Sequence, residues 1–150
     1  MGKINKIAVM TSGGDSPGMN AAIRSVVRTC AYYSKECIGV YRGYQGMIEG
    51  DFTTLTARNI NNIINKGGTI LKSARSDEFR TKEGREKAFE NVKKHNIDGI
   101  VVIGGDGSFT GGLIFQKEFD IPVIGIPGTI DNDLFGTTHT LGYDTALNTV

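Results

Sequence analysis

The chain has 150 residues, 39% of them hydrophobic, which suffices for one domain that buries about 70% of its unfolded surface. The 17 Lys and Arg residues nearly balance the 16 Asp and Glu residues, giving a formal net charge of +1, so charge favours neither nucleic acid nor a membrane as a partner. No apolar run approaches the roughly 20 residues of a membrane span. The start of the chain has no signal-peptide pattern, and Cys30 and Cys37 have no metal-ligand spacing. We therefore expect a cytoplasmic protein with free core thiols.

The first half of the chain alternates between strand and helix patterns. The run KIAVMT predicts a strand at residues 6–11, and the loop SGGDSPG follows it. Apolar residues at helical spacing predict a helix at 19–33, and CIGVYR predicts a strand at 37–42. Isoleucines at helical spacing predict another helix at 57–68, which would end at two glycines.

The second half continues this alternation. A charged amphipathic helix is predicted at 81–96, with Thr81 as its N-cap. An apolar run predicts a strand at 97–105, buried on both faces. A short helix at 108–119, a strand at 121–128 and a helix beginning at Leu141 complete the pattern. The chain is therefore expected to have an α/β fold, a Rossmann-like parallel sheet with helices on both faces.

Three glycine-rich loops follow predicted strands: SGGDSPG at 12–18, GGDGS at 104–108 and PGTIDND at 127–133. In a parallel sheet these loops share the carboxyl edge, where open α/β sheets bind ligands. Glycine lets backbone N–H groups approach a phosphate, and the helices after two of the loops add positive N-terminal dipoles. The loops favour a polyphosphate ligand over plain turns, although neither a P-loop nor a G-x-G-x-x-G fingerprint is present.

Carboxylates in these loops each allow two interpretations. Asp106 could hold Mg²⁺ beside phosphates, or it could cap the following helix. Asp131 and Asp133 could stabilise a turn, or one of them could accept a proton from an attacking hydroxyl. A phosphate cradle, a metal ligand and a candidate base together indicate phosphoryl transfer.

The segments MTSGGDSPGMNAAIR, GGT-x-L-x-SAR, VVIGGDGS and IPGTIDND resemble the N-terminal half of bacterial 6-phosphofructokinases from about residue 6 to residue 150. The resemblance implies an ATP-dependent enzyme that uses Mg²⁺ and phosphorylates the 1-hydroxyl of fructose 6-phosphate. It also implies a homotetramer with an allosteric effector site. Lipid kinases and NAD kinases share the GGDG element, but PGTIDND argues against them.

The resemblance also assigns site residues. Asp131 matches the catalytic base, with Gly14 and Arg75 as further catalytic residues. The residues that match ATP-binding positions are Gly14, Arg75, Ser76, Gly105, Asp106, Gly107 and Ser108. The residues that match sugar-phosphate-binding positions are Thr129, Ile130, Asp131 and Asp133. Asp106 matches the metal ligand.

The effector segment implied by the resemblance would bind ADP or phosphoenolpyruvate. It consists of Arg24, Ser25, Val26, Val27 and Arg28. By spacing alone, Arg24 and Arg28 form an ordinary solvated helix face. Tyr44 could flank the adenine, as the resemblance suggests, or serve as a packing anchor, and His139 is expected to be a plain loop residue.

Family members are about twice as long as this chain. We therefore expect residues 1–150 to be an incomplete ATP-binding domain, inactive alone, with the start of a connection to a sugar-phosphate domain. A pyrophosphate-dependent enzyme and a regulatory subunit with a decayed site remain as rivals. The family's pyrophosphate enzymes carry Asp where this chain has Gly107 and Lys where it has Gly128, so the resemblance favours ATP.

Overall fold

The computed structural model describes residues 2–14, 16–64, 66–128 and 141. The described residues form strands β1 (Lys6–Thr11), β2 (Glu36–Val40), β3 (Phe52–Leu55), β4 (Gly99–Gly104) and β5 (Val123–Pro127). They also form helices α1 (Met19–Tyr32), α2 (Gly43–Glu49), α3 (Lys82–Lys94) and α4 (Asp106–Phe119), and a 3₁₀ turn, η1 (Glu78–Arg80). No helix in these ranges is long and apolar enough to cross a membrane.

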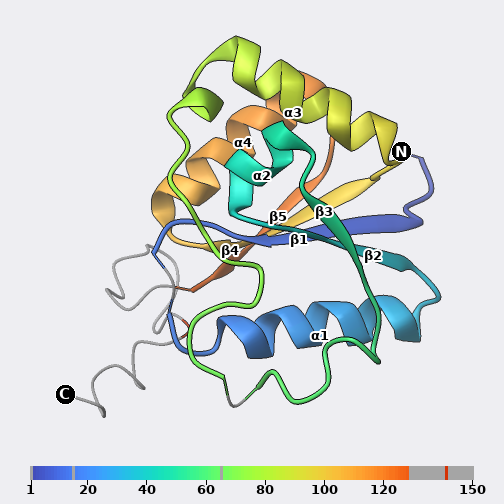
Figure 1. The fold of residues 1–150 in the computed structure, drawn as a ribbon. Helices are drawn as coiled ribbons and strands as arrows, with labels where there is room; N and C mark the ends of the chain where they lie inside the picture. Colours follow the sequence, from blue (N-terminus) through green and yellow to red (C-terminus); the bar gives the residue numbers. More distant parts are fainter. Residues whose placement is uncertain (1, 15, 65, 129–140, 142–150) are drawn as a thin grey trace.

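The strands form one sheet in the order β3-β2-β1-β4-β5. Strands β2, β1, β4 and β5 run parallel to one another, whereas β3 pairs antiparallel with β2 at the edge. Helix α1 covers one face of the sheet, and α2, α3 and α4 cover the other (Figure 1). The predicted α/β class with helices on both faces is confirmed, and the antiparallel β3 is an addition that strand-helix alternation did not predict.

Two hydrophobic cores lie on the two faces of the sheet. The alternation of side chains along β1 separates them, because Ala8 and Met10 pack beneath α2–α4 whereas Val9 packs against α1. Residues of β4 divide in the same way, with Val102 in one cluster and Ile103 in the other. The buried apolar run of β4 is therefore explained by helices on both sides.

The predicted helix at 57–68 is wrong, because the described part of this stretch forms turns. Asn59 accepts a hydrogen bond from the N–H of Thr56 and donates one to the carbonyl of Thr54, while Asn62 has a left-handed φ of 63°. Asparagine side chains compete in this way with helical backbone bonds. Ile60 and Ile63 are nevertheless buried, as their apolar character suggests.

The helices predicted at 19–33, 81–96 and 108–119 are confirmed as α1, α3 and α4, whereas the helix predicted from Leu141 onward falls, beyond Leu141 itself, outside the described residues. Thr81 caps α3, and its hydroxyl accepts a hydrogen bond of 3.0 Å from the N–H of Gly84.

Cys30 and Cys37 are buried and free. Burial raises the pKa of the Cys30 thiol, so this sulfur is in its neutral form in the core.

Candidate functional site

The three glycine-rich loops begin at one edge of the sheet. Strands β1, β4 and β5 are parallel neighbours, so their carboxyl ends lie together (Figure 1). The N–H of Ser12 donates to the carbonyl of Ile103 at 2.9 Å, and the N–H of Gly128 donates to the carbonyl of Gly104 at 2.9 Å. The predicted convergence is confirmed for the described starts of the loops.

Some glycines at this edge are required by the fold itself. Gly13 has a φ of 81°, which disfavours any residue with a side chain. A Cβ at Gly104 would lie 2.6 Å from the carbonyl oxygen of Ser12. These two glycines let the first and second loops pack closely against each other.

Gly14 and Gly107 differ from these structural glycines. Among the described residues, a Cβ at either position would meet nothing within 4 Å, and neither glycine has a positive φ. Packing and backbone strain among the described residues therefore do not explain the glycine. Open space beside two backbone segments at the ligand edge is what close approach of a phosphate requires.

A cleft of about 820 Å³ opens beside these loops. Ser12 and Gly13 line it from the first loop, and Gly107 and Ser108 line it from the first turn of α4. The segment after Ala74 also lines it and contributes Arg75, Ser76, Asp77 and Arg80. Gly14 and Asp106 are chain neighbours of the lining residues Gly13 and Gly107, whereas Gly105 neither lines the cleft nor adjoins a lining residue. Of the residues predicted to bind ATP, the structure thus places Arg75, Ser76, Gly107 and Ser108 around one cleft.

Asp106 is the first residue of α4 and is exposed. The N-cap is Gly105, and no side chain makes a capping hydrogen bond. The capping interpretation of Asp106 is therefore wrong. Its carboxylate stands at the positive end of the helix dipole and is available to a ligand.

The segment that carries Arg75 is fixed by residues that the sequence did not reveal. The Ser76 hydroxyl donates to Oε1 of Gln45 at 2.7 Å and accepts from the N–H of Phe79 at 3.2 Å. Arg85 donates to both carboxylate oxygens of Glu118, at 2.8 and 2.9 Å. It also donates to the carbonyls of Phe79 and Arg80. Although Arg85 lines the cleft, its guanidinium mainly joins η1 to α4.

Tyr44 acts as a packing anchor in the described structure. Its ring stacks on Phe79 with centroids 4.0 Å apart, and its hydroxyl donates to the carbonyl of Ser108. Gly111 leaves room for this ring, since a Cβ there would lie 3.3 Å from it. Burial raises the pKa of the Tyr44 phenol well above its ordinary value, so the hydroxyl remains a hydrogen-bond donor at neutral pH.

The predicted effector segment lies on α1. Arg24 is half-buried and Arg28 is exposed, whereas Val27 is buried in the core beneath α1. A ligand on this helix could therefore contact the arginine side chains but not that of Val27. The predicted sugar-phosphate residues Thr129, Ile130, Asp131 and Asp133, like His139, lie outside the described residues.

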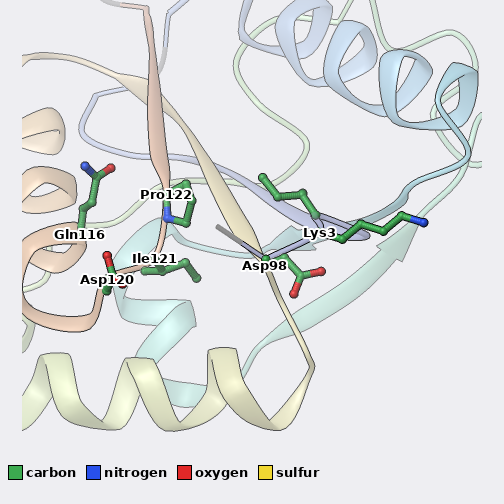
Figure 2. Close-up of a pocket in the computed structure, with 8 residues that line it drawn as sticks. Lys3, Asp98, Gln116, Asp120, Ile121 and Pro122 are labelled. Atoms are coloured by element: carbon green, nitrogen blue, oxygen red, sulfur yellow. The ribbon is translucent and has the colours of Figure 1, made fainter.

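A second cavity, of about 540 Å³, lies at the opposite edge of the sheet, where β4 and β5 begin. Figure 2 shows Lys3, Asp98, Gln116 and Asp120 around it. Oδ2 of Asp98 accepts the N–H groups of Asn5 and Lys6, and Oε1 of Gln116 accepts that of Val123. These oxygens are committed to the fold.

Metal binding at the cleft would rest on few protein ligands. Within residues 2–14, 16–64, 66–128 and 141, no group of three or more His, Cys, Asp or Glu residues could hold a metal ion. Such a group is not needed for Mg²⁺, which usually binds to one or two carboxylates together with phosphate oxygens. Asp106 on its glycine loop fits that donor set.

Comparisons with known proteins agree on one family. The family model for phosphofructokinase matches residues 6–150. The chain is 57% identical over 150 residues to ATP-dependent 6-phosphofructokinase 2 of Bacteroides thetaiotaomicron, covering 100% of this chain and 46% of the relative. It is 60% identical over 146 residues to the ATP-dependent 6-phosphofructokinase of Cytophaga hutchinsonii, covering 97% of this chain and 44% of the relative.

Comparison with solved structures also points to this family. The structure of phosphofructokinase from Saccharomyces cerevisiae superposes with a TM-score of 0.93 at 40% identity, over 95% of this chain and 22% of that chain. The chain thus spans less than half the length of the curated relatives it matches, 46% and 44% in the two cases above.

Proposed function

The chain belongs to the phosphofructokinase family, and from that premise we propose that it is the N-terminal, ATP-binding part of an ATP-dependent 6-phosphofructokinase. The reaction would transfer the γ-phosphoryl group of ATP to the 1-hydroxyl of fructose 6-phosphate. The observation that carries the proposal is the cleft at the carboxyl edge, which Gly107 and Arg75 both line and where a Cβ on Gly14 or Gly107 would meet no atom of the described residues within 4 Å.

The predicted site residues that the structure describes each have a chemical role in this proposal. Backbone N–H groups of the two glycine loops would bind phosphate oxygens, supported by the dipole of α4. The guanidinium of Arg75 would offset charge that spreads over the transferred group in the transition state. Ser76 and Ser108 also line the cleft. Positioning and charge stabilisation of this kind are the main sources of catalysis in phosphoryl transfer.

Asp106 would hold the magnesium ion that this reaction requires. Mg²⁺ bound there would neutralise charge on the β- and γ-phosphates. The exposed carboxylate makes no capping bond and so does not have to leave another partner. Asp131, beyond the described residues, is the proposed general base, with Asp133 as support and Thr129 and Ile130 beside the sugar phosphate.

We predict that ATP, not pyrophosphate, is the phosphoryl donor. Gly107 leaves open space at the cleft, whereas the Asp of pyrophosphate-using family members would fill it with a charged side chain. The measurement is a coupled assay of the full-length protein with fructose 6-phosphate and either donor. Turnover with pyrophosphate and none with ATP would contradict the prediction, and no turnover with either donor would overturn the proposed function.

The proposal extends to the rest of the protein. A sugar-phosphate domain would follow this part of the chain, and the assembled protein would be a cytoplasmic homotetramer. The relatives are more than twice as long as the segment they share with this chain, which supports a further domain. Light scattering on the full-length protein would test the tetramer, and a monomeric mass would contradict it.

We also propose that Arg24 and Arg28 bind the phosphate of an effector such as ADP or phosphoenolpyruvate. Arg28 is exposed on α1 and Arg24 is half-buried. Arg24→Ala and Arg28→Ala are expected to weaken the effector response while the unregulated rate stays near normal, because an effector loses leverage when its phosphate contact is removed. The measurement is enzyme activity as a function of effector concentration in each variant. Unchanged titrations in both variants would identify the arginines as a solvated face.

A further inference from the structure

The segment at residues 66–72 has no regular secondary structure, yet it leads directly to Arg75. Its backbone N–H and C=O groups need partners outside any helix or sheet ladder. The N–H of Arg42 donates to the carbonyl of Leu71 at 2.8 Å. Further partners come from two buried polar side chains, Asn20 at the start of α1 and Thr11 at the end of β1, which are 2% and 0% exposed. Neither residue lines the cleft, and the proposed function gives them no role.

Asn20 binds the segment at two points. Its Oδ1 accepts the N–H of Ile70 at 2.7 Å, and its Nδ2 donates to the carbonyl of Lys66 at 3.1 Å. One buried amide therefore fixes both ends of a five-residue stretch. Since leaving a buried polar group without its partner is costly, this stretch has a strongly preferred position.

Thr11 binds the same segment from the sheet. Its hydroxyl donates to the carbonyl of Lys72 at 2.9 Å and lies 2.9 Å from the hydroxyl of Thr69. Because Thr11 has one hydroxyl proton, which goes to Lys72, Thr69 must be the donor in the second bond. The Thr69 oxygen in turn accepts the N–H of Leu71 at 3.2 Å. These bonds join the end of β1 to the end of the segment.

The chain turns towards the cleft immediately after these bonds. Leu71 is 1% exposed. Its side chain packs against Gly39, where a Cβ would lie only 2.8 Å from Cδ2 of Leu71. Lys72 has a left-handed φ of 59°, which is costly for a residue with a side chain and persists only where surrounding contacts hold it. Arg75 enters the cleft three residues later. Any shift of the segment would therefore move this guanidinium.

We propose that Thr11 and Asn20 are positioning residues that hold segment 66–72 against β1 and α1 and thereby set where Arg75 enters the cleft, an inference that rests on the proposed function. A displacement of about 1 Å in a charge-stabilising group can lower a rate by roughly 10²-fold. Their effect on catalysis is accordingly transmitted through Arg75, which distinguishes them from residues that only stabilise the fold.

The test is a double-mutant cycle on the full-length protein. Asn20→Ala is expected to lower kcat/KM for ATP by roughly 10-fold or more. In an Arg75→Ala background the same change is expected to lower it less than about 2-fold, because the group being positioned is already absent. The matched control is Asn91→Ala. Asn91 also makes two backbone hydrogen bonds, to the carbonyls of Met47 and Ile48, and its removal is expected to leave kcat/KM unchanged in folded protein.

A second pair of variants avoids loss of folding as an explanation. Thr11→Val keeps the side-chain shape but removes the hydroxyl, and is expected to lower kcat/KM in the same direction as Asn20→Ala. Thr11→Ser keeps the hydroxyl and is expected to restore most of the activity. Equal losses with and without Arg75, or normal activity in both Asn20→Ala and Thr11→Val, would overturn the inference.

Hydrogen exchange separates this inference from the proposed function. Asn20→Ala and Thr11→Val are expected to speed amide exchange in residues 66–76, whether or not the protein is a kinase. Faster exchange in a protein without phosphofructokinase turnover would leave the segment fixed as described but overturn the proposed function. Unchanged exchange in an active enzyme would overturn the inference alone.

Discussion

Asp131→Ser in the full-length protein is expected to lower kcat by roughly 10²–10⁴-fold, the usual contribution of a positioned general base. An alcohol is a poor nucleophile at neutral pH, so the sugar hydroxyl needs a carboxylate to accept its proton as the bond to phosphorus forms. Asp131 lies three residues beyond Gly128, whose N–H donates to the carbonyl of Gly104 at 2.9 Å. The stretch that carries the proposed base therefore starts at the ligand edge.

Steady-state kinetics on Asp131→Ser beside Asp133→Ser make the measurement. Binding of fructose 6-phosphate is expected to change much less than kcat, because the family resemblance places its main anchors in the second domain. Two neighbouring carboxylates disfavour each other's ionisation, so only one of them is expected to act as the base. Near-normal kcat for Asp131→Ser together with a collapse for Asp133→Ser would reverse the two assignments.

Asp106→Asn is expected to lower kcat by roughly 10²-fold or more, since a metal ion contributes several kcal/mol of transition-state stabilisation. The substitution keeps the side-chain shape and removes the charge that would bind Mg²⁺. Folding is expected to change little, because Asp106 is exposed and makes no capping bond. The measurement is kcat as a function of Mg²⁺ concentration. A variant with a normal rate and normal magnesium dependence would remove Asp106 from the metal site.

The sequence predicted the parts of the fold that follow from periodic patterns. Apolar runs located β1, β2, β4 and β5, and helical spacing located α1, α3 and α4. The pattern failed at 57–68, where isoleucines have helical spacing but asparagine side chains bind neighbouring backbone groups. It also missed α2, which has only seven residues and contains two glycines, too short a stretch for periodicity to be recognised.

The site could be predicted where its residues follow strands. Parallel strands place their carboxyl ends together, so the glycine loops were expected to converge. The residues that support the site were not predictable in the same way. Asn20, Thr11 and Gln45 act on segments 31 to 61 residues away along the chain, and nothing in a linear pattern specifies such contacts. Asn20, the second residue of α1, is recognised as a support for segment 66–72 only once the structure shows which backbone groups it binds.

Nucleotide binding by two matched variants tests the central claim, that the cleft at the carboxyl edge holds Mg·ATP. Asp106 and Asp120 stand at opposite ends of α4, Asp106 at the glycine-loop edge and Asp120 in the second cavity. Replacement of either by Asn keeps the side-chain shape, and Asn tolerates the left-handed φ of 55° at Asp120. Calorimetric titration of the full-length protein with a non-hydrolysable ATP analogue, with and without Mg²⁺, is expected to show Mg²⁺-dependent binding that Asp106→Asn weakens and Asp120→Asn leaves intact. Loss of binding in Asp120→Asn with normal binding in Asp106→Asn would place the nucleotide in the second cavity, at the edge where β4 and β5 begin, and would contradict the claim.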